Sequence, residues 1–197
     1  MKEINKFFHQ LIFLIFFVFS VQAESKILSI GSSEAKVTIK VFSSLTCPHC
    51  AHFHTNIYEK LKTEYIDKGL VKFEHHSFPL DLAALNAEVV IRCQDNNKKK
   101  FELLSEIYNK QTTWAIGSDI DKINQLIKKV GINFGLSNKQ MEACLEDEKV
   151  QDEILEQRIE AQKKYKIEST PTIIINEKKY SGKIDYKQFK NAIDKKL

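Results

Sequence analysis

The chain has 197 residues, of which 43% are hydrophobic and 28% charged, with a formal net charge of +4. With only six glycines and three prolines, this composition excludes a disordered or fibrous chain and is typical of a globular one. A surplus of four positive charges without a basic face or an RNA-binding motif indicates no binding to nucleic acid.

Residues 1–23 have the pattern of an export signal. Lys2 and Lys6 precede an apolar run from Leu11 to Val21, and the small residue Ala23 follows. A helix of that length spans about 16 Å, too little for a hydrocarbon core of about 30 Å. We therefore expect cleavage after Ala23 and a soluble mature chain in the periplasm or cell envelope, with an uncleaved anchor as the alternative.

Two predicted strands enclose the first predicted helix of the mature chain. A weak strand at 26–30 precedes Val37–Ser43, whose β-branched residues indicate a buried strand. The following helix runs to about Asp67, and Leu70–Ser77 is the next strand. The apolar face of this helix consists of Phe53, Ile57, Leu61 and Tyr65.

Helical patterns alone follow, and strands return near the end of the chain. The predicted helices are Leu82–Cys93, Lys99–Lys110, one capped by Ser118, one opened by a capping box at Ser137 and Gln140, and one from about Val150 to Tyr165. The last predicted elements are strands at Thr172–Asn176 and Lys179–Ser181 and a helix at Asp185–Leu197.

This order predicts an α/β fold in which one mixed sheet is interrupted by a helical insertion. We expect residues 24–77 and 166–197 to form the two parts of the sheet domain. Residues 78–165 would form the all-helical insertion, and 1–23 the signal peptide.

The motif Cys47-Pro48-His49-Cys50 lies between a predicted strand and a predicted helix. At a helix N-terminus, free N–H groups and the helix dipole favour the Cys47 thiolate. Pro48 fits the first helical turn, and His49 adds a possible cation beside the sulfur. Cys50, one turn later, is the expected resolving thiol. Because the thiolate exists only in the reduced form, its stabilisation makes the disulfide a stronger oxidant.

Other uses of a Cys-X-X-Cys motif fit this sequence less well. Cys93 and Cys144 are too far apart to form a second such pair for a zinc site. A haem attachment site needs His directly after the second Cys, which is not the case here. His52 and His54 lie near the motif but on different helix faces. We therefore predict redox chemistry without metal or cofactor, with metal binding and a structural disulfide as alternatives.

A second feature is Thr170-Pro171, which precedes an apolar strand. A cis bond at this position would present the backbone of Thr170 to an extended peptide. Taken alone the signal is weak, because many strands begin after a proline.

Together, the two motifs and the order of the elements resemble the thioredoxin superfamily. The Cys-Pro-His-Cys sequence and the helical block at 78–165 are similar to those of the DsbA-like thiol–disulfide oxidoreductases. The resemblance implies a thioredoxin-like fold with an inserted all-helical domain. It also implies that reduced, unfolded exported proteins receive the disulfide and that a DsbB-type membrane quinone reductase restores it.

The resemblance also implies roles for individual residues. Cys47 is the expected nucleophile, Cys50 the resolving thiol and His49 the stabiliser of the thiolate, while Thr170 and Pro171 form the substrate clamp. The chain departs from the family at Val41, where members commonly carry a buried acidic residue six positions before the first cysteine. That substitution removes the group expected to relay a proton to or from Cys50.

Several alternatives stay open at this point. Cys93 and Cys144 are expected to form a structural disulfide, with two buried free thiols as the alternative. The chain is expected to be a monomer. A disulfide isomerase or reductase is the first alternative function, supported by Thr170 before the proline and opposed by the shortness of the segment before the first strand. A copper- or zinc-binding protein that uses the same Cys and His cluster is the other.

Overall fold

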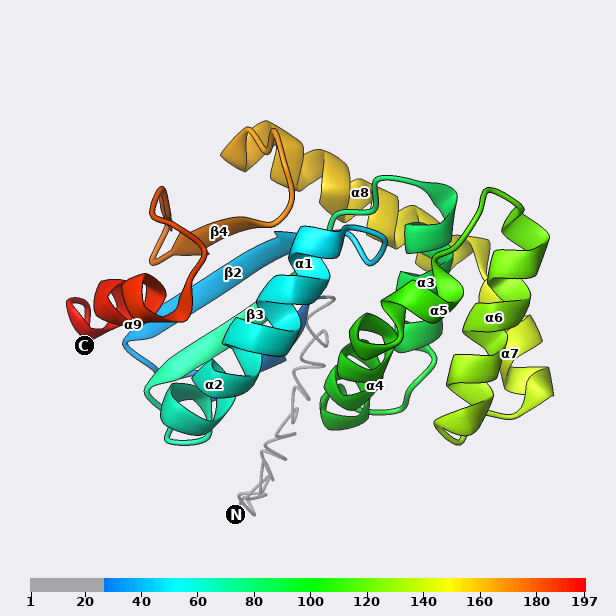
Figure 1. The fold of residues 1–197 in the computed structure, drawn as a ribbon, viewed down its shortest axis with the longest axis horizontal. Helices are drawn as coiled ribbons and strands as arrows, with labels where there is room; N and C mark the ends of the chain where they lie inside the picture. The colour runs from blue at the N-terminus through cyan, green and yellow to red at the C-terminus, as the bar shows by residue number, and fades with distance from the viewer. Residues whose placement is uncertain (1–26) are drawn as a thin grey trace, which may run out of the picture.

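The computed structural model describes residues 27–197, so the predicted export signal lies outside the described residues (Figure 1). Its centre is a five-stranded sheet with the spatial order β1-β3-β2-β4-β5. The strands are β1 Leu28–Ile30, β2 Val37–Ser43, β3 Val71–Ser77, β4 Thr172–Ile175 and β5 Lys178–Lys179. Strand β2 pairs in parallel with β3 and antiparallel with β4. Segments far apart in the sequence therefore share one sheet, as the pattern predicts.

The first helix runs without interruption from Pro48 to Ile66 but changes its winding along the way. It consists of α1 Pro48–Phe53, a π-helical segment η1 His54–Tyr58, α2 Glu59–Leu61 and a second π-helical segment η2 Lys62–Ile66. Apolar residues repeat here every four positions, which in a regular α-helix would rotate each one by roughly 40° from the last. The wider π turns offset this drift, and all four predicted apolar residues are buried.

The remaining helices are α3 Leu82–Arg92, α4 Asn97–Asn109, α5 Gln111–Trp114, α6 Ile120–Asn133, α7 Asn138–Leu145, α8 Glu148–Tyr165 and α9 Tyr186–Asp194. The capping box at Ser137 and Gln140 is present at the start of α7. The prediction that Ser118 caps α6 is wrong. Asp119 caps it, because its carboxylate accepts hydrogen bonds from the backbone N–H groups of Asp121 and Lys122.

The two faces of the sheet are covered by different helices (Figure 1). Val41 points to the face where the first helix and α3–α6 share one continuous core with the sheet. Its neighbour Phe42 points to the opposite face and packs against Ala161 of α8, as the alternation along a strand requires. Helix α8 also contacts α3, so it connects the helical segment with the sheet. Within residues 27–197, no helix has the length and apolarity needed to cross a membrane.

Candidate active site

Cys47 and Cys50 lie where β2 passes into the first helix. Cys47 is the N-cap of α1, with Pro48 in the first helical turn, and its carbonyl accepts hydrogen bonds from the N–H groups of Cys50 and Ala51, each at 3.1 Å. Both cysteines are free thiols. Cys47 is partly exposed, whereas Cys50 is 1% exposed and belongs to the core.

The environment gives the two thiols opposite acidities. A hydrogen bond from the Cys50 thiol, together with the backbone N–H groups of Cys50 and His49, lowers the pKa of Cys47 to about 5, against the effect of burial. Burial, and next the neighbouring Cys47, raise the pKa of Cys50 far above its usual range. At neutral pH the pair therefore consists of an accessible thiolate and a buried thiol.

The Thr170–Pro171 segment faces the first cysteine. The peptide bond between these residues is cis, and the Cys47 Sγ donates a hydrogen bond to the Thr170 carbonyl oxygen at 3.4 Å. A separate hydrogen bond, with the side chain of Thr170, helps to lower the pKa of Cys47. The fold thus brings together the two motifs that the sequence analysis selected, although more than a hundred residues separate them.

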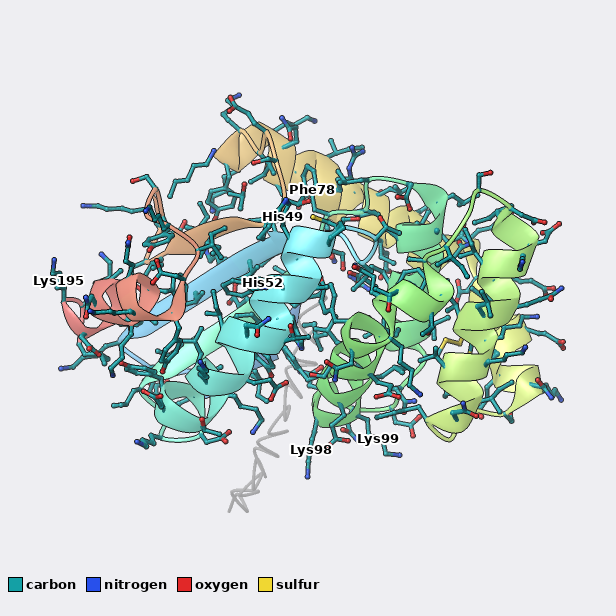
Figure 2. The ribbon with its side chains drawn as sticks, in the orientation of Figure 1. His49, His52, Phe78, Lys98, Lys99 and Lys195 are labelled. Atoms are coloured by element: carbon teal, nitrogen blue, oxygen red, sulfur yellow. A yellow bond between two sulfur atoms is a disulfide. The ribbon has the colours of Figure 1, made fainter. Side chains whose placement is uncertain are left out.

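The three histidines near the motif do not converge on one point. His49 is exposed at the start of α1 and His52 is exposed further along the first helix (Figure 2). His54 is buried, and its Nε2 is 2.8 Å from the Ser105 hydroxyl. In the described part of the chain, no three His, Cys, Asp or Glu side chains are placed to hold a metal ion. His49 acts on Cys47 in this structure through its backbone N–H, so a role for its imidazole stays a prediction.

Two side chains that the sequence analysis did not select hold the active-site loop. The Gln111 amide donates to the carbonyl oxygens of Leu45 at 2.7 Å and Cys47 at 3.1 Å. The Thr46 hydroxyl donates to the carboxylate of Asp81 at 2.7 Å, and that carboxylate also caps α3. Only Asp81 carries a local signal, because Asp before a helix is a common N-cap. Gln111 depends on a tertiary contact that has no local sequence signal.

A buried histidine–carboxylate contact lies beside Val41, where the chain departs from the family pattern. Val41 is 1% exposed and pairs in register with His75 of β3. The His75 Nε2 lies 2.7 Å from one oxygen of Glu88 on α3, and the Ser77 hydroxyl lies 2.8 Å from the other. Burial alone would raise the pKa of Glu88, but His75, Arg92 and Ser77 together lower it. Glu88 is therefore ionised inside the core.

The other two cysteines are joined to each other. A disulfide links Cys93, directly after α3, with Cys144 of α7, and their Cα atoms are 6.1 Å apart. The bond connects two helices of the helical segment and leaves Cys47 and Cys50 as a separate pair.

Comparison with known proteins places this fold and site in a family. A family model described as Thioredoxin matches residues 23–195. The chain belongs to the thioredoxin family. Its fold is that of the DsbA proteins: the crystal structure of Wolbachia pipientis α-DsbA1 superimposes with a TM-score of 0.81 at 27% identity, over 86% of this chain and 90% of that one. The predicted thioredoxin-like fold with helices inserted into it is thereby confirmed.

The names of similar proteins refer to disulfide chemistry. Disulfide bond formation protein D of Bacillus subtilis is 29% identical over 178 residues, which cover 85% of this chain and 76% of that protein. A Rickettsia bellii protein, provisionally named a protein-disulfide oxidoreductase, is 25% identical over 75% of this chain. The chain spans just over half the length of this rickettsial relative, 56%.

Proposed function

We propose that this chain is an exported thiol–disulfide oxidoreductase that donates a Cys47–Cys50 disulfide to reduced, unfolded exported proteins. The observation that carries the proposal is the inequality of the two thiols. A Cys47 pKa of about 5 makes Cys47 a good leaving group, and a stable thiolate in the reduced form favours disulfide donation. The names of the relatives support the same reaction class.

Disulfide donation takes place in two exchanges. A client thiolate attacks the exposed Cys47 Sγ of the oxidised protein, a mixed disulfide forms, and Cys50 leaves with the electron pair of the broken S–S bond. Cys50 then takes up a proton from solvent. A second client thiolate attacks the client sulfur of the mixed disulfide, and Cys47 leaves as a thiolate. The client is oxidised and the Cys47–Cys50 pair is reduced by two electrons.

The surface around Cys47 is suited to an unfolded polypeptide. In a complex, the Thr170 carbonyl would accept a hydrogen bond from the client backbone in place of the Cys47 thiol. A groove of about 350 Å³ between Thr46, Asp81 and Gly117 adjoins the active-site loop. Leu80 and Leu82 beside it are each 54% exposed and can contact apolar side chains of an unfolded client.

Reoxidation and delivery complete the proposed cycle of the protein. A DsbB-type membrane quinone reductase would reoxidise the Cys47–Cys50 pair, and no cofactor of the chain itself is needed for exchange. The predicted export signal at 1–23 would deliver the protein, as a monomer, to the periplasm or cell envelope.

Equilibration with glutathione buffers tests the direction of the reaction. A variant with both Cys93→Ala and Cys144→Ala leaves Cys47 and Cys50 as the only thiols that titrate. We expect a reduction potential more oxidising than about −200 mV. A potential more reducing than about −250 mV would instead identify a reductase. Binding of copper or zinc by the reduced pair without disulfide exchange would support the metal-binding alternative.

A further inference from the structure

An arginine of α8 has no charged partner. Only two of the 30 basic residues of the chain are arginines, Arg92 and Arg158. The Arg92 guanidinium donates a hydrogen bond to the side-chain oxygen of Gln157 at 2.8 Å. Within residues 27–197, by contrast, the buried Nε of Arg158 makes no hydrogen bond, and no ion pair includes its guanidinium. Because buried donors are nearly always paired, the donors of Arg158 are left unsatisfied by the fold itself.

The sequence of α8 explains why Arg158 is unpaired along its own helix. Side chains meet on a helix surface when they are three or four positions apart. The residues at those spacings from Arg158 are uncharged: Ile154, Leu155, Ala161 and Gln162. Glu156 and Glu160 are each two positions away, a spacing at which side chains do not face each other. The positive charge of Arg158 therefore stays uncompensated on α8.

An aromatic ring fixes the position of this guanidinium. The Arg158 Cζ lies 5.0 Å from the centroid of the Phe78 ring, and Phe78 is buried in one cluster with Ala161 of α8. Such stacking uses the flat face of the guanidinium and none of its N–H donors. Arg158 is partly exposed, and only its Nε is both buried and unpaired. The Nη donors are therefore accessible from solvent.

Phe78 connects this arginine with the loop that carries Cys47. The Phe78 backbone N–H donates a hydrogen bond to the Ser43 carbonyl oxygen at 2.8 Å. The carbonyl oxygen of the next residue, Ser44, accepts a hydrogen bond from the Cys47 N–H at 3.1 Å. Since an extended polypeptide rises about 3.3 Å per residue, a client bonded to Cys47 can bring side chains a few residues from its own cysteine to α8.

Exposed apolar side chains accompany Arg158 on α8. Leu155, three positions before it, is 36% exposed, and Ile159, directly after it, is 49% exposed. Leu155 and Ile159 are four positions apart, so they lie on one stripe of the helix. An arginine among apolar side chains is typical of surfaces that bind polypeptides. The charge and these neighbours together fit a segment in which an acidic residue stands among apolar ones.

We propose that Arg158 binds a carboxylate of the client, so that the protein prefers cysteines close to an acidic residue. This inference rests on the proposed exchange at Cys47 and names a class of client for it. A guanidinium offers a carboxylate two parallel N–H donors, which the ammonium group of a lysine cannot do. Arg158 touches no reacting atom, so it acts on the choice of client and not on the breaking of the S–S bond.

Exchange with matched peptides tests this preference. Each peptide carries two cysteines and a Glu between one and five residues from the first cysteine, and its match carries Gln at the same position. Initial rates of oxidation at low peptide concentration give kcat/KM. The Glu/Gln rate ratio of wild type, divided by that of Arg158→Gln, cancels the effect of Glu on the thiols of the peptide itself. We expect this quotient to be about five at one or more positions, the upper range for a partly exposed ion pair.

Salt and a second variant provide the controls. In 1 M salt the quotient should fall toward one, because charges are then screened within about 3 Å. Lys163→Gln removes a positive charge from an exposed position of the same helix, five residues away, and its quotient should be close to one. A quotient near one for Arg158→Gln at every position, or equal quotients in the two variants, would overturn the inference.

The same comparison stays informative if the direction of exchange is wrong. A strongly reducing potential of the Cys47–Cys50 pair would contradict the proposed donation of disulfides. The peptides would then be supplied as disulfides to the reduced protein, and the quotient would still report whether Arg158 recognises the carboxylate.

Discussion

Two cysteine side chains, three residues apart, differ in the acidity of their thiols. Cys47 lies at the open end of a helix, where hydrogen-bond donors surround its sulfur and lower its pKa to about 5. Cys50 points into the core, where burial raises its pKa. The difference comes from placement alone, since both groups are unmodified thiols. An attacking sulfur is therefore directed to Cys47, the only one of the pair that it can reach.

The acidity of Cys47 makes the stability of the reduced protein depend on pH. In the folded state the thiolate forms above about pH 5, whereas in the unfolded chain the thiol has its ordinary pKa of 9.0. A lowered pKa stabilises the folded state fully above the unfolded value, and the contribution is lost as the pH falls through about 5. We expect the reduced form to melt above the oxidised form at pH 8 and the difference in Tm to shrink toward pH 5.

Thermal melting of both forms across this range measures the effect. The oxidised form is the internal control, because its Cys47 does not titrate. Cys50 stays protonated below pH 8 in both folded and unfolded protein, so it does not disturb the comparison. A Tm difference that is independent of pH, or that grows toward pH 5, would contradict the assignment of the thiolate to Cys47.

The residues of the site differ in how far the sequence reveals them. Cys47 and Cys50 could be predicted from a short motif with a local meaning, whereas Thr170–Pro171 is a weak signal that gains weight only together with that motif. Gln111 could not, since its role depends on how the start of α5 meets the active-site loop.

Among the elements, the junction of α4 and α5 supports the active-site loop through two hydrogen bonds. Gln111 begins α5 and donates hydrogen bonds to two carbonyl oxygens of that loop. A loop between a strand and a helix has backbone groups that neither element satisfies. The amide of Gln111 therefore supplies hydrogen bonds to backbone carbonyl groups of the loop, as a neighbouring strand does within a sheet.

Gln111→Met should destabilise the protein, because it removes both hydrogen bonds while keeping the length of the side chain. Leaving a buried acceptor without a partner costs about 1–3 kcal/mol, and urea unfolding measures this loss. Gln125→Met, at an exposed position of α6, is the control and should stay within about 0.5 kcal/mol of wild type. Equal stability of the two variants would show that the loop does not depend on Gln111.

Helix ends show why element boundaries are predicted unevenly. The capping box of Ser137 and Gln140 could be predicted because it is a pattern of two residues with fixed spacing. At α6, Ser118 and Asp119 are both good N-caps, and only the backbone conformation decides between them. The π-helical segments of the first helix had no sequence signal beyond the four-residue repeat, which also fits an ordinary α-helix.

At the scale of the whole molecule, the four cysteines form two separate pairs, one bonded and one free. Cys93 and Cys144 connect α3 and α7 across 51 positions of sequence, whereas Cys47 and Cys50 lie at the end of β2. From chain entropy, closing a loop of this length stabilises the folded state by about 4 kcal/mol. Substitutions at Cys47 or Cys50 should therefore affect disulfide exchange, and substitutions at Cys93 and Cys144 should affect stability.

Alanine variants test whether one cysteine pair serves disulfide exchange and the other serves the stability of the folded state. Cys47→Ala should abolish the oxidation of a dithiol peptide. A variant carrying both Cys93→Ala and Cys144→Ala should keep most of this activity while its free energy of unfolding falls by up to about 4 kcal/mol. Activity assays at a temperature well below both melting transitions make the comparison valid. Comparable losses of activity in the two variants would show that the second disulfide takes part in the exchange.

The pairing of β2 with β4 determines the order in which the site can be assembled. Ile39 of β2 pairs with Ile175 of β4. Strand β2, which precedes Cys47, can therefore form this pairing only after β4 has been synthesised. Contacts between such distant segments form late, because closing a long loop is entropically costly. During synthesis, both cysteines are thus present long before the segment that faces them. The protein must therefore fold around two free thiols whose facing segment is added late.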